Sequence, residues 1–502
     1  MLYNNSGGSF YGDETPIAAI ATVVGNSAIT LIRCSGKNSI ELVSSVFVPA
    51  GKSSFIKNAP GNTVIHGWVV KLRDQKEEIG EKRGDIENNE LIDEVLISVF
   101  RAPKSYTGED SLDICCHGGH NAGFAVMDAL KSAGFRDALP GEFTFRAFMN
   151  GKIDLTKSES VMELVSAKTE TGRRRAVSRL CGSLQTEINE IKDILVRVLA
   201  GAEIFLDYSE DEVSADTDEI SGMLPNRDIA LEAHSRLKKL SDTWRTERIY
   251  QEGITCVIAG RPNAGKSSLF NLFLREDRSI VTDVPGTTRD WIEAWISIEG
   301  IPVRLIDTAG LRDTDDSVEK IGVLRSRMLL QEADIVLYLI DGAEGLTYED
   351  KAECGMFNAE ESESGDHAWS SLIKNNSVLL LWNKCDIAKP FPSDNFSPVC
   401  LSAKTGEGLT ELHAAISSVI LRQAGSMNEP SAASIGTIRQ KNLVDSACSA
   451  LGEALVLAEK EEPLDLIAPL LRDAVNSLGE ITGEISTADI LEEMFSKFCV
   501  GK

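Results

Sequence analysis

A phosphate-binding loop is the clearest chemical signature in this chain. The apolar run Ile254 to Ala259 leads into Gly260-Arg261-Pro262-Asn263-Ala264-Gly265-Lys266-Ser267, and Leu269 to Leu274 continues with helical spacing. Glycines let backbone N–H groups converge on phosphates at a helix N-terminus, where the helix dipole also favours anions. The pattern predicts that Lys266 reaches the β- and γ-phosphates of a nucleotide and that the Ser267 hydroxyl binds Mg²⁺.

Two further motifs suit the metal and the terminal phosphate. The run Val303 to Ile306 ends in Asp307-Thr308-Ala309-Gly310, where Asp307 can hold the Mg²⁺ shell and the Gly310 amide can sense a γ-phosphate. Upstream, Gly286-Thr287-Thr288-Arg289-Asp290 supplies Thr288, a hydroxyl suited to close over Mg²⁺ when the γ-phosphate is present. The order of these motifs along the chain predicts a nucleotide-dependent switch.

A base-recognition motif selects the nucleotide. The run Val378 to Trp382 leads into Asn383-Lys384-Cys385-Asp386. The Asp386 carboxylate can accept hydrogen bonds from N1–H and the 2-amino group of guanine, whereas adenine would leave this acceptor unpaired. Ser402-Ala403-Lys404, after Val399 to Leu401, resembles the loop whose backbone amide supports the guanine carbonyl. The motifs together predict a GTPase rather than an ATPase.

One position departs from the small signalling GTPases. Leu311 stands where those proteins usually place the glutamine that orients the attacking water, and a hydrophobic side chain cannot polarise water. Another group must therefore assist hydrolysis. One alternative is Asn263, whose amide oxygen could help to hold a monovalent cation near the phosphates. The other is an acid downstream of the motif, and the choices there are Asp313, Asp315, Asp316 and Glu319. The residues alone do not choose among them.

Length and composition limit the possible domain number, binding partners and location of the protein. Its 502 residues suggest about three domains. The formal net charge is −26, so nucleic acid can be contacted only through a local basic patch. No apolar run approaches the ~18 to 20 residues of a membrane helix. The ten cysteines include no C-x-x-C pair, which argues against a zinc site or a disulfide framework. We expect a cytoplasmic protein without integral membrane association.

Periodicity predicts a multidomain architecture with an inserted domain. We expect an α+β N-terminal domain over residues 1–125, a discontinuous α-helical domain over 126–250 and 426–502, and an α/β P-loop GTPase domain inserted at 251–425. Strands are expected at Ile17 to Val24, Ala28 to Cys34, Val64 to Leu72, Glu94 to Phe100 and Leu112 to Cys116, the first two joined by a hairpin at Gly25-Asn26-Ser27. Helices are expected at Ala125 to Ala133, Ser158 to Thr169, Leu184 to Phe205, Ile229 to Glu247, Gln440 to Glu459, Leu464 to Leu478 and Thr487 to Phe498, with N-terminal signals at Ser158-Glu159-Ser160 and at Thr186.

Motifs outside the GTPase block resemble a known family. They are Thr107-Gly108-Glu109-Asp110, His117-Gly118-Gly119, Pro140-Gly141-Glu142-Phe143, the stretch Arg146 to Leu155, Glu480-Ile481-Thr482-Gly483-Glu484 and the ending Phe498-Cys499-Val500-Gly501-Lys502. Together with the GTPase motifs they resemble the bacterial tRNA-modification GTPases of the MnmE (TrmE) family along nearly the whole chain. The usual ending of that family has isoleucine at the Val500 position.

The resemblance implies a specific activity. The family works with an FAD-containing partner of the MnmG (GidA) type, in a heterotetramer or larger complex. Together they build an aminomethyl or carboxymethylaminomethyl group on C5 of the wobble uridine of certain tRNAs. The resemblance also implies an N-terminal domain that forms a homodimer and binds 5-formyltetrahydrofolate or methylenetetrahydrofolate. The inserted GTPase would be activated by K⁺ and would meet its second copy across the dimer.

The resemblance assigns site residues one by one. It places folate contacts at Arg33, Glu109, Lys152 and Lys502, potassium ligands at Asn263, Thr282, Val284 and Thr287, and magnesium ligands at Ser267 and Thr288. Catalytic roles fall on Glu319, which would orient the attacking water, and on Cys499, which is needed for modification. The GTP contacts are Asn263, Ala264, Gly265, Lys266, Ser267, Ser268, Thr282, Asp283, Val284, Pro285, Gly286, Thr287, Thr288, Asp307, Thr308, Ala309, Gly310, Asn383, Lys384, Asp386, Ser402, Ala403 and Lys404. Lys497 and Lys502 would favour a Cys499 thiolate, which is a hypothesis from charge alone.

Some segments depart from the family or stay open. Val23 to Ala28 replaces a Pro-Pro-Gly-Arg-Gly-Gly-like loop, and the charged segment Arg73 to Glu90 and the acidic insertion Glu353 to Asp366 match no function. Two basic clusters could contact tRNA phosphates, although such clusters are more often solvated helix faces. They are Arg173-Arg174-Arg175 with Arg179, and Lys238-Lys239 with Arg245 and Arg248. The competing interpretations are a ribosome-assembly GTPase, for which we find no KH-type Gly-x-x-Gly loop near the C-terminus, and a switch acting on proteins.

Overall fold

The computed structural model describes residues 13–51, 56–71, 90–207, 224–276, 292–307, 329, 332–348, 350, 378–390, 397–424 and 433–501. The chain divides into two compact units, Met1–Ser158 with Gly479–Lys502, and Glu159–Leu478. Residues 73–89 of the charged segment and residues 353–366 of the acidic insertion lie outside the described residues.

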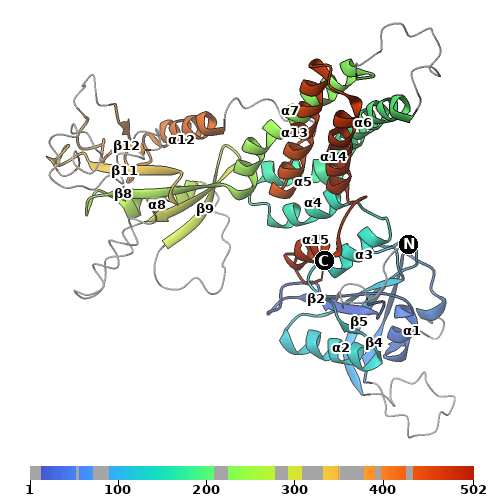
Figure 1. Cartoon of the computed structure of the whole chain (residues 1–502). Coiled ribbons are helices and arrows are strands. Elements are labelled where there is room, and N and C mark those ends of the chain that lie inside the picture. The colour runs from blue at the N-terminus through green and yellow to red at the C-terminus, as the bar shows by residue number, and fades with distance from the viewer. Residues whose placement is uncertain are drawn as a thin grey trace, which may run out of the picture. The chain divides into compact units, whose positions relative to one another are not determined.

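A seven-stranded sheet organises the first unit (Figure 1). Its order is β3-β4-β5-β6-β2-β1-β7, and the described pairs are antiparallel except β1 with β7. The strands are β1 (Ile17–Ile20), β2 (Ile29–Ser35), β3 (Phe47–Pro49), β4 (Thr63–Val70), β5 (Leu91–Phe100), β6 (Ser111–His117) and β7 (Arg136–Asp137). The predicted hairpin is confirmed, although β1 ends at Ile20 instead of Val24 and β2 is shifted by one residue, so that the connecting turn is longer than expected.

The two faces of this sheet have different chemistry. Alternate residues of β2, Ile32 and Cys34, are fully buried in a core that also contains apolar residues of α1 (Ser39–Ser45) and α2 (His120–Ala133). The intervening residues of β2 point to the opposite face, because successive side chains of a strand alternate. There Arg33 pairs with Asp113 of β6, and Ser35 pairs with Ser111. We call Arg33, Ser35, Ser111 and Asp113 the polar platform.

Two helices of the first unit join distant parts of the chain. The helix α3 (Glu142–Met149) packs against α15 (Ala488–Ser496) near the C-terminus. The rings of Phe145 and Phe495 meet edge to face with their centroids 5.4 Å apart, a favoured aromatic geometry. The helix α3 was not predicted, because its eight residues are too few to establish a helical period.

Two predicted helix starts were wrong. The helix α4 (Leu155–Ser166) begins before Ser158-Glu159-Ser160, and Thr186 lies inside α6 (Ser183–Asp207). The Asp154 side chain accepts a hydrogen bond from the Lys157 amide at 2.9 Å and therefore caps α4 at an earlier residue. The predicted signal contained hydroxyl and acidic residues of the right kind, but Asp154 offers the same chemistry one turn earlier.

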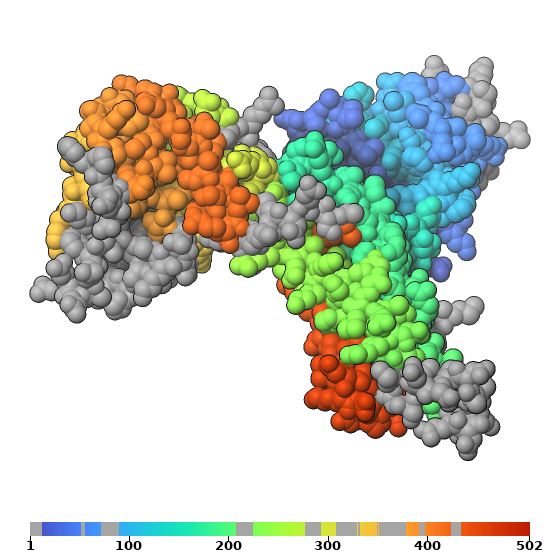
Figure 2. Space-filling view, turned by 90° about the horizontal axis from the view of Figure 1, so that it is seen from above, coloured from blue at the N-terminus to red at the C-terminus, as the bar shows by residue number. Residues whose placement is uncertain are grey.

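The helical part of the second unit is built from two stretches of the chain. One stretch precedes and the other follows the segment that forms a second, six-stranded sheet. It contains α5 (Glu170–Leu180), α6, α7 (Arg227–Glu252), α13 (Ile438–Glu459) and most of α14 (Leu464–Thr482). Figures 1 and 2 show α7 and α13 side by side, and the Ser241 hydroxyl donates a hydrogen bond to Asp445 at 2.7 Å between them. The α5 helix was not predicted.

A buried ionic cluster holds the helical part together. The Arg179 guanidinium donates to Glu163 at 2.7 Å, to Glu247 at 2.8 Å and to the Ser434 hydroxyl at 2.9 Å. Arg179 and Glu247 are each only 1 % exposed, and Arg175 also pairs with Glu247. Arg175 and Arg179 therefore have internal partners, and the prediction that Arg179 could contact tRNA phosphates is wrong because its side chain is buried. Arg173 and Arg174 remain exposed and pair with Glu170.

A six-stranded sheet forms the remaining part of the second unit. Its order is β13-β12-β11-β8-β10-β9, and among the described pairs only β9 with β10 is antiparallel. The strands are β8 (Ile254–Gly260), β9 (Ile292–Ile298), β10 (Ile301–Asp307), β11 (Ile335–Asp341), β12 (Val378–Asn383) and β13 (Val399–Cys400). The strands β8, β10, β12 and β13 were predicted within a residue or two, whereas β9 and β11 were not predicted.

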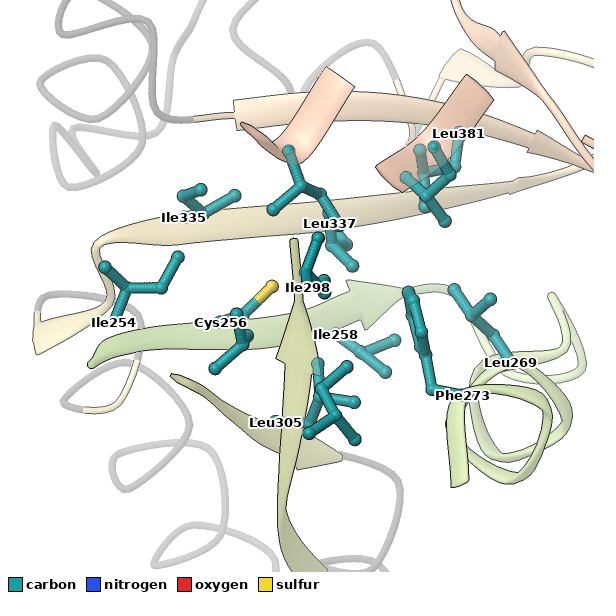
Figure 3. Packing of buried hydrophobic residues seen from close by; sticks show 14 of the residues in the cluster. Ile254, Cys256, Ile258, Leu269, Phe273, Ile298, Leu305, Ile335, Leu337 and Leu381 are labelled. Carbon is teal, nitrogen blue, oxygen red and sulfur yellow. The ribbon is translucent and has the colours of Figure 1, made fainter. Parts of the chain in front are cut away.

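One face of this sheet packs against two helices. The apolar residues of β8 and β11 in Figure 3, among them Cys256, Ile258 and Leu337, share one core with Leu269 and Phe273 of α8 (Lys266–Glu276). The helix α12 (Leu409–Ala424) contributes Leu412, Ile416 and Ile420 to the same core. Strands buried on both faces read as continuous apolar runs, and β8 was recognised because such a run leads directly into the phosphate-binding motif. None of the helices that the structure describes is long and apolar enough to cross a membrane.

Candidate functional site

The predicted GTP-binding residues gather at one edge of the six-stranded sheet. Parallel strands present their carboxyl ends together, and ligands of open α/β sheets bind there. Asp307, Asp341 and Asn383 are the last residues of β10, β11 and β12, and the phosphate-binding loop follows β8. The register of the sheet places Asp341 opposite Asn383, and Leu339 opposite Gly260.

The phosphate-binding loop is held in a tight conformation. Lys266 Nζ donates to the carbonyls of Gly260 at 2.8 Å and Arg261 at 2.9 Å, so its stem folds back under the loop. Gly265 has φ +100°, and a Cβ on it would overlap the Asn383 amide nitrogen. Both the torsion and the close approach require glycine at this position. The loop is therefore shaped to present backbone amides to an anion at the start of α8.

Two oxygen ligands of a hard cation stand next to each other. Ser267 Oγ donates to Asp307 Oδ2 at 2.9 Å, and Asp307 is 1 % exposed. Hydroxyl and carboxylate oxygens are the ligands that Mg²⁺ prefers in nucleotide sites. These residues therefore fit the predicted metal, which would neutralise negative charge on the nucleotide phosphates when bound. The other predicted magnesium ligand, Thr288, lies outside the described residues.

The base-recognition motif is tied to the phosphate-binding loop. Asn383 Nδ2 donates to the Ala264 carbonyl at 2.7 Å, and Asn383 Oδ1 accepts from the Ala403 amide at 2.9 Å. One amide side chain thus joins three loops that were predicted to bind different parts of one nucleotide. The Asp386 carboxylate is exposed at the end of this motif, as recognition of a base from solution requires. Ser402 is buried, while Lys404 is exposed.

Asp341 is a residue of the candidate site that was not predicted from the sequence. Its Oδ2 accepts from Lys384 Nζ at 2.6 Å, and its Oδ1 accepts from the Ala343 amide at 3.0 Å. Lys384 has φ +62°, so the backbone of the motif is bent where the ion pair forms. A signal was present, because Asp341 ends an apolar run in the same way as Asp307. Without a motif around it, that signal was not distinctive.

The predicted potassium ligand Asn263 lies in the phosphate-binding loop. It has φ +64°, a left-handed conformation that asparagine tolerates better than most residues, and its side chain is exposed. Several predicted residues lie outside the described part of the chain. They are Thr282, Asp283, Val284, Pro285, Gly286, Thr287, Thr288, Thr308, Ala309, Gly310, Glu319 and Lys502.

The predicted folate contacts gather on the polar platform of the first unit. Arg33 Nε donates to Asp113 at 3.0 Å, and Arg33 Nη1 lies 3.5 Å from the Gly501 carbonyl. The Ser35 hydroxyl donates to Glu109 at 2.8 Å. The Tyr106 ring lies 5.8 Å from the Arg33 guanidinium, and burial raises the pKa of the Tyr106 hydroxyl. Charged and aromatic groups thus line one face of the sheet.

Lys152 joins the same region through its neighbours. Lys152 Nζ donates to the Pro103 carbonyl at 2.8 Å, and the Asn150 side chain donates to the Thr107 carbonyl at 2.8 Å. Both contacts tie the end of α3 to the loop that carries Glu109. Of the four predicted folate contacts, the structure therefore brings Arg33, Glu109 and Lys152 to one region.

The C-terminal segment is seated in the first unit as well. The Cys499 carbonyl accepts a hydrogen bond from the Gly141 amide at 3.3 Å, while the Cys499 side chain is exposed. Gly141 has φ +69°, and a Cβ there would lie 2.7 Å from the Phe495 carbonyl. A Cβ on Gly501 would lie 2.8 Å from Cα of Ala21, at the end of β1. The chain end thus runs beside the polar platform.

These features define a class of protein. The strand–loop–helix at β8 and α8, the Ser267–Asp307 pair and the Asn383 link together make a guanine-nucleotide site of the P-loop type, in a chain that also carries a separate α+β unit and a helical part. Two family models match the chain. The GTP-binding protein TrmE N-terminus matches residues 16–152, and the MnmE helical domain matches residues 155–499. The chain belongs to the MnmE family of tRNA modification GTPases.

Relatives match over nearly the full length. The tRNA modification GTPase MnmE of Treponema denticola is 41% identical and covers 98% of this chain and 99% of its own. The protein of the same name from Carboxydothermus hydrogenoformans is 39% identical and covers 97% and 100%. Among solved structures, the G domain of the T. maritima FeoB iron transporter is 26% identical over 34% of this chain and 99% of its own, with a TM-score of 0.24. The protein is a GTP-binding, GTP-hydrolysing enzyme of tRNA modification.

Proposed function

We propose that this enzyme couples GTP hydrolysis to modification of C5 of the wobble uridine of certain tRNAs. The group added is an aminomethyl or carboxymethylaminomethyl group, its one-carbon unit comes from 5-formyltetrahydrofolate or methylenetetrahydrofolate, and the FAD is supplied by a partner of the MnmG type. The enzyme acts as a cytoplasmic homodimer. Of the domains expected from the sequence we keep the inserted GTPase part, 251–425, whereas residues 126–158 and 479–502 group with the N-terminal unit rather than with the helical domain.

One observation carries the proposal. The C-terminal segment that bears Cys499 lies against the polar platform, where Gly501 approaches Arg33 and Ala21. Residues from opposite ends of the chain, one set matching folate contacts and the other the cysteine of the family, thus occupy one region. Arg33 and Lys152 supply cations for the anionic glutamate of a folate. Glu109 supplies acceptors for the N–H donors of its pterin.

The GTPase part supplies the energy input. We assign Mg²⁺ binding to Ser267 and Thr288, potassium binding to Asn263, Thr282, Val284 and Thr287, and orientation of the attacking water to Glu319. The Ser267–Asp307 contact supports the first assignment, because it places two oxygen ligands together. Since Leu311 cannot orient water, a cation beside Asn263 would stabilise the charge that develops on the phosphates.

Nucleoside mass spectrometry of tRNA tests the proposal. Cells that lack this chain should lose the C5-aminomethyl-type wobble uridines. Wild type should restore them, and Cys499→Ser should not. Cys181→Ser is a matched control, because Cys181 is also exposed but lies in the helical part of the second unit. If deletion leaves the nucleoside profile unchanged, the proposed modification is wrong and a role in ribosome assembly becomes the better explanation of the GTPase.

A further inference from the structure

The Glu109 carboxylate is held by a buried arginine from a neighbouring helix. Arg146 of α3 directs Nη1 to both Glu109 oxygens, at 3.4 Å from Oε1 and 3.2 Å from Oε2. The Arg146 side chain is 7 % exposed and that of Glu109 is 26 % exposed. Arg146 therefore lies behind the carboxylate, and Glu109 keeps part of its surface accessible.

Arg146 cannot easily move away from Glu109. Its Nη2 donates to Glu142 at 2.9 Å and to the carbonyls of Asp13 at 3.1 Å and Thr15 at 2.9 Å, and its Nε donates to Glu142 at 3.3 Å. The Glu142 side chain is fully buried. A guanidinium whose fork is fixed on several sides gives a donor of constant direction, which a flexible lysine would not.

A chain of buried hydroxyls holds Glu109 from a second side. Ser35 Oγ donates to Glu109 Oε2 at 2.8 Å, and Ser35 lies 2.7 Å from Thr107 Oγ1 and 3.1 Å from Ser111 Oγ. An ionised carboxylate can only accept, so the Ser35 proton points to Glu109; Thr107 can then donate toward Ser35, while the Ser111 hydroxyl donates to the Glu109 backbone carbonyl. Ser35 and Thr107 are at most 1 % exposed. Water therefore does not compete for these hydrogen bonds.

Arg146 and the buried hydroxyls together leave part of the Glu109 carboxylate open to a ligand. A carboxylate has about four lone-pair positions. Ser35 and Arg146 both act on Oε2, whereas among the residues that the structure describes Oε1 receives only the longer Arg146 contact. The open acceptor positions are thus mainly on Oε1. A ligand with N–H donors, such as the 2-amino-4-oxo edge of a reduced pterin, would find this carboxylate already oriented, which lowers the cost of binding.

We infer that Arg146 and Ser35 are positioning residues that fix Glu109 for the pterin of the folate donor. The inference rests on the proposed folate site and names the groups that make it specific. Neither residue touches the ligand, so each acts only through the carboxylate. This separates them from Arg33 and Lys152, whose charges would act on the folate directly.

A double-mutant cycle tests the inference on the full chain, with calorimetric titration of 5-formyltetrahydrofolate as the readout. In the wild-type background, Arg146→Lys should weaken binding about tenfold and Ser35→Ala about threefold, since each loses a hydrogen bond to a charged group. In the Glu109→Gln background, neither change should weaken binding more than about twofold, because residues that act through one group are not additive. A purely structural role would give the same loss in both backgrounds.

Arg136→Lys is the matched control. Arg136 pairs with Glu142, at 2.6 Å, but not with Glu109, so its replacement disturbs the same buried acid and should leave the affinity for 5-formyltetrahydrofolate unchanged. If Arg146→Lys fails to fold by circular dichroism, Ser35→Ala carries the test alone. Equal losses in both backgrounds would overturn the inference and leave the folate site standing. Absence of binding by wild type would instead overturn the proposed function.

Discussion

Asp341 and Lys384 form an ion pair of 2.6 Å across the ends of the neighbouring strands β11 and β12. Asp341 is mostly buried, and Lys384 belongs to the motif that is predicted to recognise guanine. The same aspartate also accepts from the Ala343 amide, so its orientation does not depend on Lys384. The sheet edge therefore fixes the lysine stem that would lie along the base.

Loss of this ion pair should weaken nucleotide binding. We expect Asp341→Ala to raise the Kd for GDP about tenfold, because Lys384 then loses its charged partner and samples other rotamers. Fluorescent GDP titration measures the change. Glu344→Ala is the control, since Glu344 is an exposed acid of the following loop that pairs with Arg261 instead. An unchanged Kd in Asp341→Ala would show that Lys384 needs no positioning.

Gly265 should be intolerant of any side chain. Gly265→Ala should abolish GTP binding, because its Cβ would overlap Asn383 and break the link between the phosphate loop and the base motif. Gly345→Ala separates sterics from backbone strain, since Gly345 also has positive φ, +79°, but nothing lies within 4 Å of its Cβ. It should lose only about 1 kcal/mol of stability and keep GTP binding. Comparable affinities in the two variants would contradict the steric argument.

The sequence predicted this site where a motif requires each residue. Lys266, Ser267, Asp307 and Asn383 meet as expected, because a strand–loop–helix pattern constrains them locally. Asp341 was missed, since its role depends on the pairing of β11 with β12 across a long segment of sequence. The strands β9 and β11 were likewise found only in the structure.

In the folate region, too, contacts between residues that are distant in the sequence could not be predicted. Arg33 and Glu109 were proposed by resemblance, but no pattern connects them to Arg146 or Ser35. Those contacts arise because β2 pairs with β6 and because α3 packs beside the loop before β6. Arg179 is buried, whereas its neighbours Arg173 and Arg174 are exposed. The sequence alone could not distinguish the buried arginine from the exposed ones.

Potassium should accelerate GTP hydrolysis through Asn263. We expect turnover at least about tenfold faster in K⁺ than in Na⁺ at equal ionic strength, since a bound cation would stabilise the developing phosphate charge. Asn263→Gly removes the amide oxygen yet allows the positive φ of this position, so it should abolish the difference without straining the loop. Steady-state phosphate release measures both. Equal rates for wild type in the two salts would remove the proposed role.

Cys499 should be the reactive cysteine of the first unit. Burial and the nearby Asp93 raise the pKa of Cys116 to about 11, and burial raises the pKa of Cys34 as well. At pH 8 the thiolate fraction of Cys116 is about 10⁻³, whereas Cys499 is exposed. Iodoacetamide should therefore modify Cys499 first, as peptide mass spectrometry can show. Saturating 5-formyltetrahydrofolate should slow this reaction but not that of Cys181. Faster labelling of Cys34 would contradict the assignment.

Arg179 should stabilise the helical part rather than bind tRNA. Burial raises the pKa of Glu163 and Arg179 opposes that effect, so removal of the guanidinium leaves Glu163 and Glu247 as buried carboxylates without their shared partner. We expect Arg179→Met to lower the free energy of unfolding by about 3–5 kcal/mol, measured by denaturant titration. Arg173→Ala, on the exposed side of the same helix, should leave the unfolding midpoint unchanged. If the two variants were equally stable and Arg179→Met specifically weakened tRNA binding, the arginine would have to leave its cluster to reach phosphate, and the ionic cluster would be a switch rather than a fixed support.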